Sequence, residues 1–225
     1  MIDSHSILLR MRDVAFALEA AGSHRRRLNR IGLQKFIYLY DAVSTLYETF
    51  PPVEGHYTYK HGPYDPAIQN AVDSLAFRGF VHVHGVERDN EGNVSATYGL
   101  TASGSNFTQE LAMVEPFQVR WRIAVDVAAK VNARGWGRLK ELAYSEPTYA
   151  MERIHGFGRR LKPEDRFSNS TASLLEIFKR TLRAGFKDVR PSNQVILELF
   201  FRYLENYAHY SRRPSISVSS PSKGA

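Results

Sequence analysis

The segment from Tyr59 to Gly104 constrains the fold of this chain more than any other stretch. Asp65 is a natural helix N-cap and Pro66 suits the first helical position, so we expect a helix to begin there. Apolar residues recur on one face of this helix, and Gly79 ends it. The segment therefore opens with an amphipathic helix that has to bury one of its faces.

A pair of strands follows that helix. Residues 80–86 alternate between two faces and predict the first strand. The turn-forming residues 89–93 send the chain back along a second strand over 94–100, and Thr101 then opens another helix. A helix followed by a two-stranded hairpin in this order is how a winged-helix unit ends.

Further amphipathic helices are expected on both sides of this segment. The apolar periodicity predicts helices over 6–21, 33–50, 104–115, 117–133, 138–144, 148–154, 172–183 and 192–210. The apolar stripe of helix 33–50 is broad, so we expect it to be the central core helix. The predicted fold class is mainly α within the α+β group: a helical protein with a winged-helix-like β-hairpin.

The chain divides into three parts by composition. We expect a winged-helix-like domain over 1–112, a basic helical region packed on it over 113–210, and a disordered Ser/Pro-rich tail over 211–225. Pro51-Pro52 end the central helix, and the link 55–64 is longer than a helix-turn-helix turn. This link is either a third strand beside the hairpin or a loop that places aromatic residues and Lys60 on a surface.

The amino-acid composition limits where the protein is expected in the cell and which cysteine chemistry it can have. The chain contains no cysteine, which excludes a disulfide framework and any thiolate site and suits a reducing cytoplasm. No apolar run approaches the roughly 20 residues of a membrane span, and charges interrupt the first 20 residues, where a signal peptide needs an apolar core. We therefore expect a soluble cytoplasmic protein without a membrane partner.

The net charge of +7 is distributed unevenly. Residues 1–112 carry 10 Lys and Arg against 12 Asp and Glu, whereas residues 113–225 carry 20 against 11. Contacts to phosphate supply most of the affinity of a protein that binds double-stranded DNA. The near-neutral charge of the winged half therefore argues against DNA binding by this half. The basic half could meet nucleic acid or an acidic protein, or its cations could be solvated and paired with neighbouring glutamates.

No catalytic motif is present in the sequence. GxSxG, HExxH, a phosphate-binding glycine loop and GxGxxG are all missing, so we predict neither an enzyme nor a cofactor. His82 and His84 share a strand face, but zinc needs three or four converging ligands, which favours exposed histidines and no metal. Residues 89–93 lack the central Gly and the final Glu of a calcium loop, so a tight hairpin turn is the better interpretation.

Three short motifs carry a family resemblance. They are LQKFIYLY at 33–40, YKHGPYD at 59–65 and LTASG at 100–104. In this order they resemble the Panacea or SocA-like antitoxin domain family and its YwgA-like bacterial relatives, over roughly residues 28–110. His61 replaces the aromatic residue usual in the second motif. The resemblance implies a non-enzymatic antitoxin or adaptor that binds a protein encoded nearby, in a toxin–antitoxin or phage-defence module.

The resemblance also implies partner-binding positions. Carried over residue by residue, these are Gln34, Lys35, Lys60, His61, Gly62, Pro63 and Tyr64. We expect Gln34 and Lys35 to lie at a surface. Gly62 is expected to adopt a positive φ or to allow close backbone approach, and Pro63 to fix an extended entry into the helix.

The alternative is a winged-helix regulator that binds nucleic acid, DNA or RNA. Its candidate contacts are Arg25, Arg26, Arg27, Gln69, Asn70, Arg78, Arg159 and Arg160. Gln and Asn can read adenine and Arg can read guanine, but Asp73 on the same helix would face phosphates unfavourably. A solvated face is therefore favoured for the helix that begins at Pro66.

Overall fold

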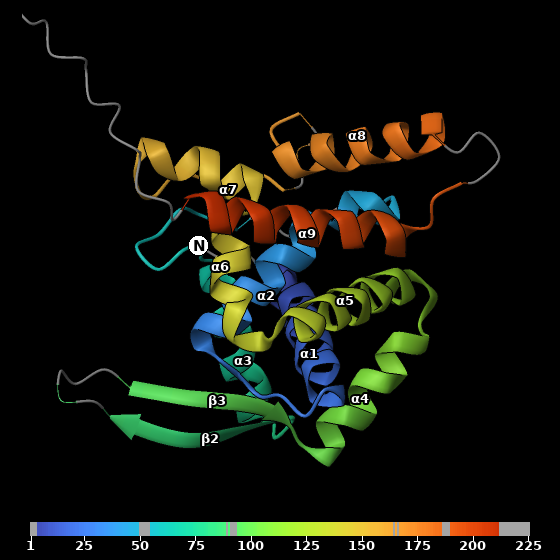
Figure 1. Cartoon of the computed structure of the whole chain (residues 1–225). Helices are drawn as coiled ribbons and strands as arrows, with labels where there is room; N and C mark the ends of the chain where they lie inside the picture. The colour runs from blue at the N-terminus through green and yellow to red at the C-terminus, as the bar shows by residue number, and fades with distance from the viewer. Residues whose placement is uncertain are drawn as a thin grey trace, which may run out of the picture.

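The computed structural model describes residues 4–49, 55–88, 90, 94–163, 165, 167–185 and 190–211. The first half contains α1 (Ser4–Ser23), β1 (Leu28–Asn29), α2 (Arg30–Ala42), η1 (Ser44–Tyr47), α3 (Pro66–Phe77), β2 (Val81–Arg88) and β3 (Val94–Leu100). The second half contains α4 (Ala102–Met113), α5 (Glu115–Arg134), η2 (Trp136–Arg138), α6 (Leu139–Tyr144), α7 (Pro147–Glu152), η3 (Arg153–His155), α8 (Ser170–Gly185) and α9 (Asn193–Ser211). The predicted fold class, mainly α with a small β-hairpin, is confirmed (Figure 1).

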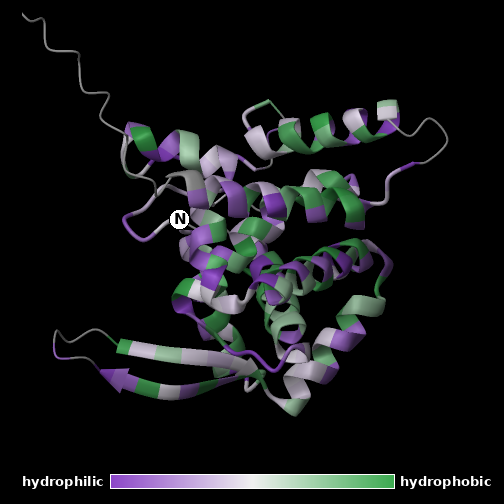
Figure 2. Cartoon of the chain, in the orientation of Figure 1, coloured by the Kyte–Doolittle hydropathy of each residue, from purple (hydrophilic) through white to green (hydrophobic). Residues whose placement is uncertain are grey.

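The first half has the element order of a winged helix. A helix, a short strand, two helices and a hairpin follow one another, and the three strands form an antiparallel sheet in the order β1-β3-β2. The third strand is Leu28–Asn29, which pairs with Tyr98 and Thr97. The link 55–64 is therefore a loop and not the third strand. The hairpin extends away from the helical body, and polar and apolar residues alternate along it (Figure 2).

Helix α3 begins as its sequence predicts. The Asp65 side chain accepts a hydrogen bond from the Ala67 backbone N–H at 2.8 Å, and Pro66 occupies the first turn. The buried side chains of this helix lie on one face and are Ala67, Ile68, Ala71, Val72 and Leu75. Gly79 follows the helix with φ of +75°, which a residue with a side chain rarely adopts.

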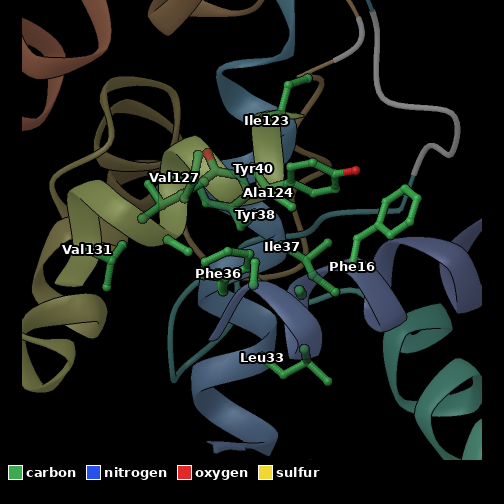
Figure 3. Close-up of a cluster of buried hydrophobic side chains, with 14 of the residues drawn as sticks. Phe16, Leu33, Phe36, Ile37, Tyr38, Tyr40, Ile123, Ala124, Val127 and Val131 are labelled. Carbon is green, nitrogen blue, oxygen red and sulfur yellow. The ribbon is translucent and has the colours of Figure 1, made fainter. Parts of the chain in front are cut away.

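Helix α2 is the centre of the molecule. Every residue from Leu33 to Ala42 is buried, and its aromatic and aliphatic side chains meet those of α1 and α5 in one core (Figure 3). The predicted helix 33–50 is too long, because α2 ends at Ala42 and a 3-10 turn follows. The Ser44 hydroxyl donates to the Tyr40 carbonyl at 3.1 Å, a local bond that competes with continued helix.

The second half completes that core. Helix α5 packs against α1 and α2, and α8 and α9 lie together on the opposite side of the molecule from the hairpin (Figure 1). The buried cluster is continuous from Val14 in α1 to Leu204 in α9. Of the predicted disordered tail 211–225, Ser211 is described and ends α9, so the prediction is wrong for that residue. The rest of the tail and most of the turn 89–93 fall outside the described residues.

A glycine fixes how α4 leaves the hairpin, and it gives a first test. A Cβ on Gly104 would lie 2.0 Å from the Phe80 carbonyl oxygen, whereas a Cβ on Gly22 in α1 would meet nothing within 4 Å. We expect Gly104→Ala to lower the free energy of unfolding by about 1–3 kcal/mol, as overpacking does. Gly22→Ala should cause no loss, because alanine favours helix over glycine. Urea unfolding measures both; equal stabilities of the two variants would contradict the close approach.

Candidate partner-binding face

Two loops that are far apart in the sequence are joined by backbone hydrogen bonds. The Thr58 N–H donates to the Arg159 carbonyl at 2.8 Å, and the Gly158 N–H donates to the Thr58 carbonyl at 2.8 Å. The Leu161 N–H donates to the His56 carbonyl at 2.7 Å. Within the first loop, Tyr57 and Tyr64 form an isolated antiparallel bridge. The loop 55–64 and the basic loop 156–161 therefore form one surface.

We call this surface the two-loop face. It consists of Tyr57, Tyr59, Lys60, His61, Tyr64, Phe157, Arg159 and Arg160. Tyr59 is 51% exposed and Phe157 is 67% exposed, and the four charged or imidazole side chains are also exposed. The structure thus brings three predicted partner-binding residues beside two residues predicted for nucleic-acid binding.

Two of the predicted partner-binding residues lie in the interior, so their expected surface position is wrong. Gln34 and Lys35 are each only 3% exposed. The Gln34 amide makes two 2.8 Å hydrogen bonds to the backbone of Asp65, one as donor to the carbonyl and one as acceptor from the N–H. The Lys35 Nζ donates to the Pro63 carbonyl at 2.8 Å. Both side chains are covered because the loop 55–64 folds back over α2.

Gly62 and Pro63 are buried as well and do not reach the surface. Gly62 has φ of +91°, and a Cβ there would lie 2.1 Å from the Tyr144 ring and 2.7 Å from Lys35 Cε. The expectation of a positive φ and a close approach is confirmed. These motif residues shape the loop, while Lys60 and His61 at its tip remain exposed and Tyr64 is half-buried.

Tyr64 and Tyr59 form the aromatic part of the face. Their ring centroids are 5.4 Å apart, and the Arg30 guanidinium lies over the Tyr64 ring at 5.9 Å. His61 packs edge-on against Tyr59 at 6.2 Å. Tyr59 and Tyr64 are therefore held by neighbouring rings, and Tyr64 also by a cation.

A buried ionic network lies beneath the loop 55–64. It consists of Arg10, Asp13, Asp41, His56, Asp65 and Arg120, all almost fully shielded from solvent. Asp41 accepts from Arg10 at 2.6 Å and from Arg120 at 2.7 Å. His56 Nε2 lies 2.9 Å from Asp41, and Arg10 Nε donates to Asp65 at 2.8 Å. The network ties α1, α2, α5 and the loop together.

The charges of this network stabilise one another. Burial alone would raise the pKa of Asp41, but Arg10 and Arg120 hold that pKa well below its usual range. Arg120 also donates to Asp13 at 2.9 Å. Since the members are enclosed and mutually paired, the arrangement is structural support for the loop and not an open reactive site.

The sequence patterns did not indicate this network. Asp13 and Arg120 are 107 positions apart, and no spacing rule relates them. The available signal was the presence of Asp13 and Asp41 inside otherwise apolar helices. A carboxylate on a buried helix face is rare unless it is paired.

A buried carboxylate outside this network, Glu146, lies beneath the basic loop. Glu146 accepts hydrogen bonds from the hydroxyls of Tyr38 and Thr171, and from the Tyr149 N–H at 2.7 Å as the cap of α7. Helix α7 is followed by η3, which leads into the basic loop. Both loops of the face therefore rest on polar groups that are fixed in the core.

The surplus positive charge of the second half is partly absorbed by ion pairs. Arg134 donates to Glu198 at 2.8 Å and to Glu205 at 3.0 Å, and Arg138 donates to Glu205 at 2.6 Å. The hydrogen bond from Arg134 lowers the pKa of Glu198 to about 2. These pairs hold α9 on α5. Arg159 pairs with Glu152 at 2.7 Å, so a carboxylate lies beside the cations of the two-loop face.

The outward face of α3 gives little support for duplex reading. Gln69 donates to Asp73 at 2.8 Å, Asn70 and Arg78 are exposed, and residues 66–77 include no Lys or Arg. Arg25, Arg26 and Arg27 are exposed in the turn between α1 and β1, away from this helix in the chain. The predicted nucleic-acid residues are thus divided among three elements.

Metal binding and membrane insertion find no support in the residues described here. The His82 and His84 rings lie 5.5 Å apart, and within the described ranges no three His, Asp or Glu side chains are placed to hold a metal ion. Among the helices described, none has the length and apolar character needed to cross a membrane. The calcium-loop candidate 89–93 lies outside the described residues, apart from Asn90.

Comparison with known families adds nothing to this picture. No family model matches the chain, and no curated protein matches it. The family resemblance of the three motifs therefore stays a prediction.

The ionic network gives a second test. Asp41→Asn keeps the shape of the side chain but leaves Arg10 and Arg120 with one buried negative charge fewer. We expect the free energy of unfolding to fall by about 3–5 kcal/mol, the usual effect of breaking a buried pair. The control is Arg180→Gln, which removes an exposed pair with Glu176 and should change stability by less than about 0.5 kcal/mol. Similar losses for the two variants in urea would contradict the structural role.

Lys35 gives a third test. Burial, and secondarily the charge of Lys140, lower the pKa of Lys35 from 10.5 to about 7. Between these two values the unfolded chain binds more protons than the folded one, so stability should rise with pH. We expect urea unfolding from pH 7 to 9.5 to show this rise in the parent protein and in Lys60→Met, an exposed control. In Lys35→Met the rise should disappear; a flat profile in the parent protein would contradict the burial of the amine.

Proposed function

We propose that this chain is a non-enzymatic, antitoxin-like or adaptor-like component of a bacterial toxin–antitoxin or phage-defence module, acting in the cytoplasm. It binds a protein encoded by a neighbouring gene, and the two-loop face is the surface that makes this contact. The proposal combines the motif resemblance with the geometry of the face.

The observation that carries the proposal is the combination of exposed aromatic rings and a fixed backbone. Tyr59 and Phe157 are more than half exposed, yet the loops that bear them are joined by main-chain hydrogen bonds. Aromatic and Arg side chains dominate the binding energy of protein interfaces. Because the loops are already ordered, little conformational entropy is lost on association.

The charge of the face indicates the chemistry of the partner. Lys60, Arg159 and Arg160 are exposed on it, and Glu152 is the carboxylate that pairs with Arg159. Complementary charge steers association and selects among partners. The partner's contact surface should accordingly be acidic around pockets that accept aromatic rings.

Binding of the purified product of the adjacent gene tests the proposal. The full chain and its variants are titrated with that protein by calorimetry. We expect Tyr59→Ser combined with Phe157→Ser to weaken binding by about 30-fold or more, since truncating interface hot spots costs about 2 kcal/mol or more.

A matched control removes exposed apolar groups elsewhere. Phe77 on α3 is 95% exposed and Ile177 on α8 is 57% exposed, so Phe77→Ser combined with Ile177→Ser should bind as the parent does. Absence of binding by the adjacent gene product would overturn the function. Equal weakening in both double variants would overturn the assignment of the face.

A further inference from the structure

An open hollow of about 760 Å³ lies at the base of the hairpin. Its lining includes Glu19, Arg25, Arg26, Arg27, Gly99 and Ser105. We call it the wing-base hollow. Three consecutive arginines from the turn between α1 and β1 form its basic wall.

Within the described part of the chain, the three arginine side chains form no ion pair and no hydrogen bond with a protein group. Glu19 is the single carboxylate in the lining, and it is engaged by Ser105 at 2.8 Å and by Gln109 at 3.4 Å. The described lining therefore holds three arginines against one carboxylate, and positive charge is in excess.

The backbone holds these arginines together despite their repulsion. Arg25 has φ of +57°, a left-handed conformation that costs a residue with a side chain about 1–2 kcal/mol. The N–H groups of Arg25 and Arg26 donate to the carbonyls of Gly22 and Ala21 at 2.8 and 3.0 Å. Leu28 is buried and pairs with Tyr98 of β3, which anchors the other end of the turn. Local strain and like charge are thus concentrated in one fixed turn.

Gly99 lies in the lining of the hollow, close to Arg27 and to the hairpin histidines. A Cβ at this position would lie 3.6 Å from Arg27 Cγ and 3.7 Å from His84 Nε2. The His82 and His84 rings are 5.5 Å apart. Imidazole groups of the first strand of the hairpin therefore lie near the arginines.

We infer that the wing-base hollow binds the phosphodiester backbone of nucleic acid. Guanidinium groups match phosphate oxygens with paired hydrogen bonds, and three of them in one turn can follow successive phosphates. The lining offers no exposed aromatic ring or large exposed apolar side chain, which an acidic protein would need as an anchor. Because contacts to phosphate carry no sequence information, binding is expected to be independent of base sequence.

This inference is independent of the two-loop face and its protein partner. The test uses the full chain with a fluorescein-labelled 20-base-pair random duplex and the same strand alone, measured by anisotropy from 25 to 300 mM KCl. The variant is Arg25→Asn with Arg26→Gln and Arg27→Gln, because asparagine tolerates the left-handed conformation. We expect affinity to fall at least tenfold at 25 mM KCl. The slope of log affinity against log salt should shrink by about 2 to 3, as for three lost phosphate contacts.

A charge-matched control distinguishes a defined binding site from nonspecific electrostatic attraction of nucleic acid to a basic protein. The control variant, Arg180→Gln with Arg183→Gln and Arg202→Gln, also removes three positive charges, but from exposed positions on α8 and α9. Its slope of log affinity against log salt should equal that of the parent protein. Far-ultraviolet circular dichroism establishes that both triple variants are folded. No binding at 25 mM KCl, or equal losses in the two variants, would overturn the inference. Displacement of the duplex by polyglutamate, added at the same concentration of negative charge, would also overturn the inference, because the hollow would then bind acidic polypeptide.

Discussion

The interaction on which the rest of the structure depends is the sharing of Asp41 by Arg10 and Arg120. Asp41 lies on the most buried helix of the molecule, and its carboxylate joins an arginine from α1 to one from α5. Arg10 extends the connection to Asp65, the residue that caps α3. Ion pairs centred on the Asp41 carboxylate therefore connect α1, α2 and α5, and reach the start of α3 through Arg10. Ion pairs of this kind add little net stability over an apolar core, but they are satisfied in only one arrangement, which gives the packing a defined register.

That register determines what the surface can present. The loop 55–64 is fixed from below by His56, Lys35 and Gln34, so its tip projects in a constant position. The basic loop is fixed in the same manner through Glu146. Exposed rings on a rigid base are suited to recognition of a matching surface, whereas the strained arginine turn beside the hairpin is suited to a phosphodiester backbone. The chain thus presents two basic surfaces with different chemistry.

Local rules predicted the fold well and the candidate site only in part. The cap at Asp65, the positive φ at Gly62 and the helix–hairpin order follow from the conformations of single residues, which a sequence displays directly. The burial of Gln34 and Lys35 depends on a loop about 25 residues later folding over them, and polar residues next to an apolar stripe look exposed until that is known. The hydrogen bond between Thr58 and Arg159 joins backbone groups, so the residue types at these positions do not indicate it. Long-range placement was therefore the part that the sequence could not reveal.

The position of Arg120 late in the sequence affects the order in which the buried ionic network can form during synthesis of the chain. Asp13 and Asp41 belong to the first 42 residues, yet Arg120, which neutralises both, leaves the ribosome only after the entire hairpin and α4. Until then the nascent chain has two carboxylates facing a core that lacks one of their counter-ions and the apolar face of α5. The ion pairs of Asp13 and Asp41 with Arg10 can form early, whereas those with Arg120 complete the network only once α5 has been made.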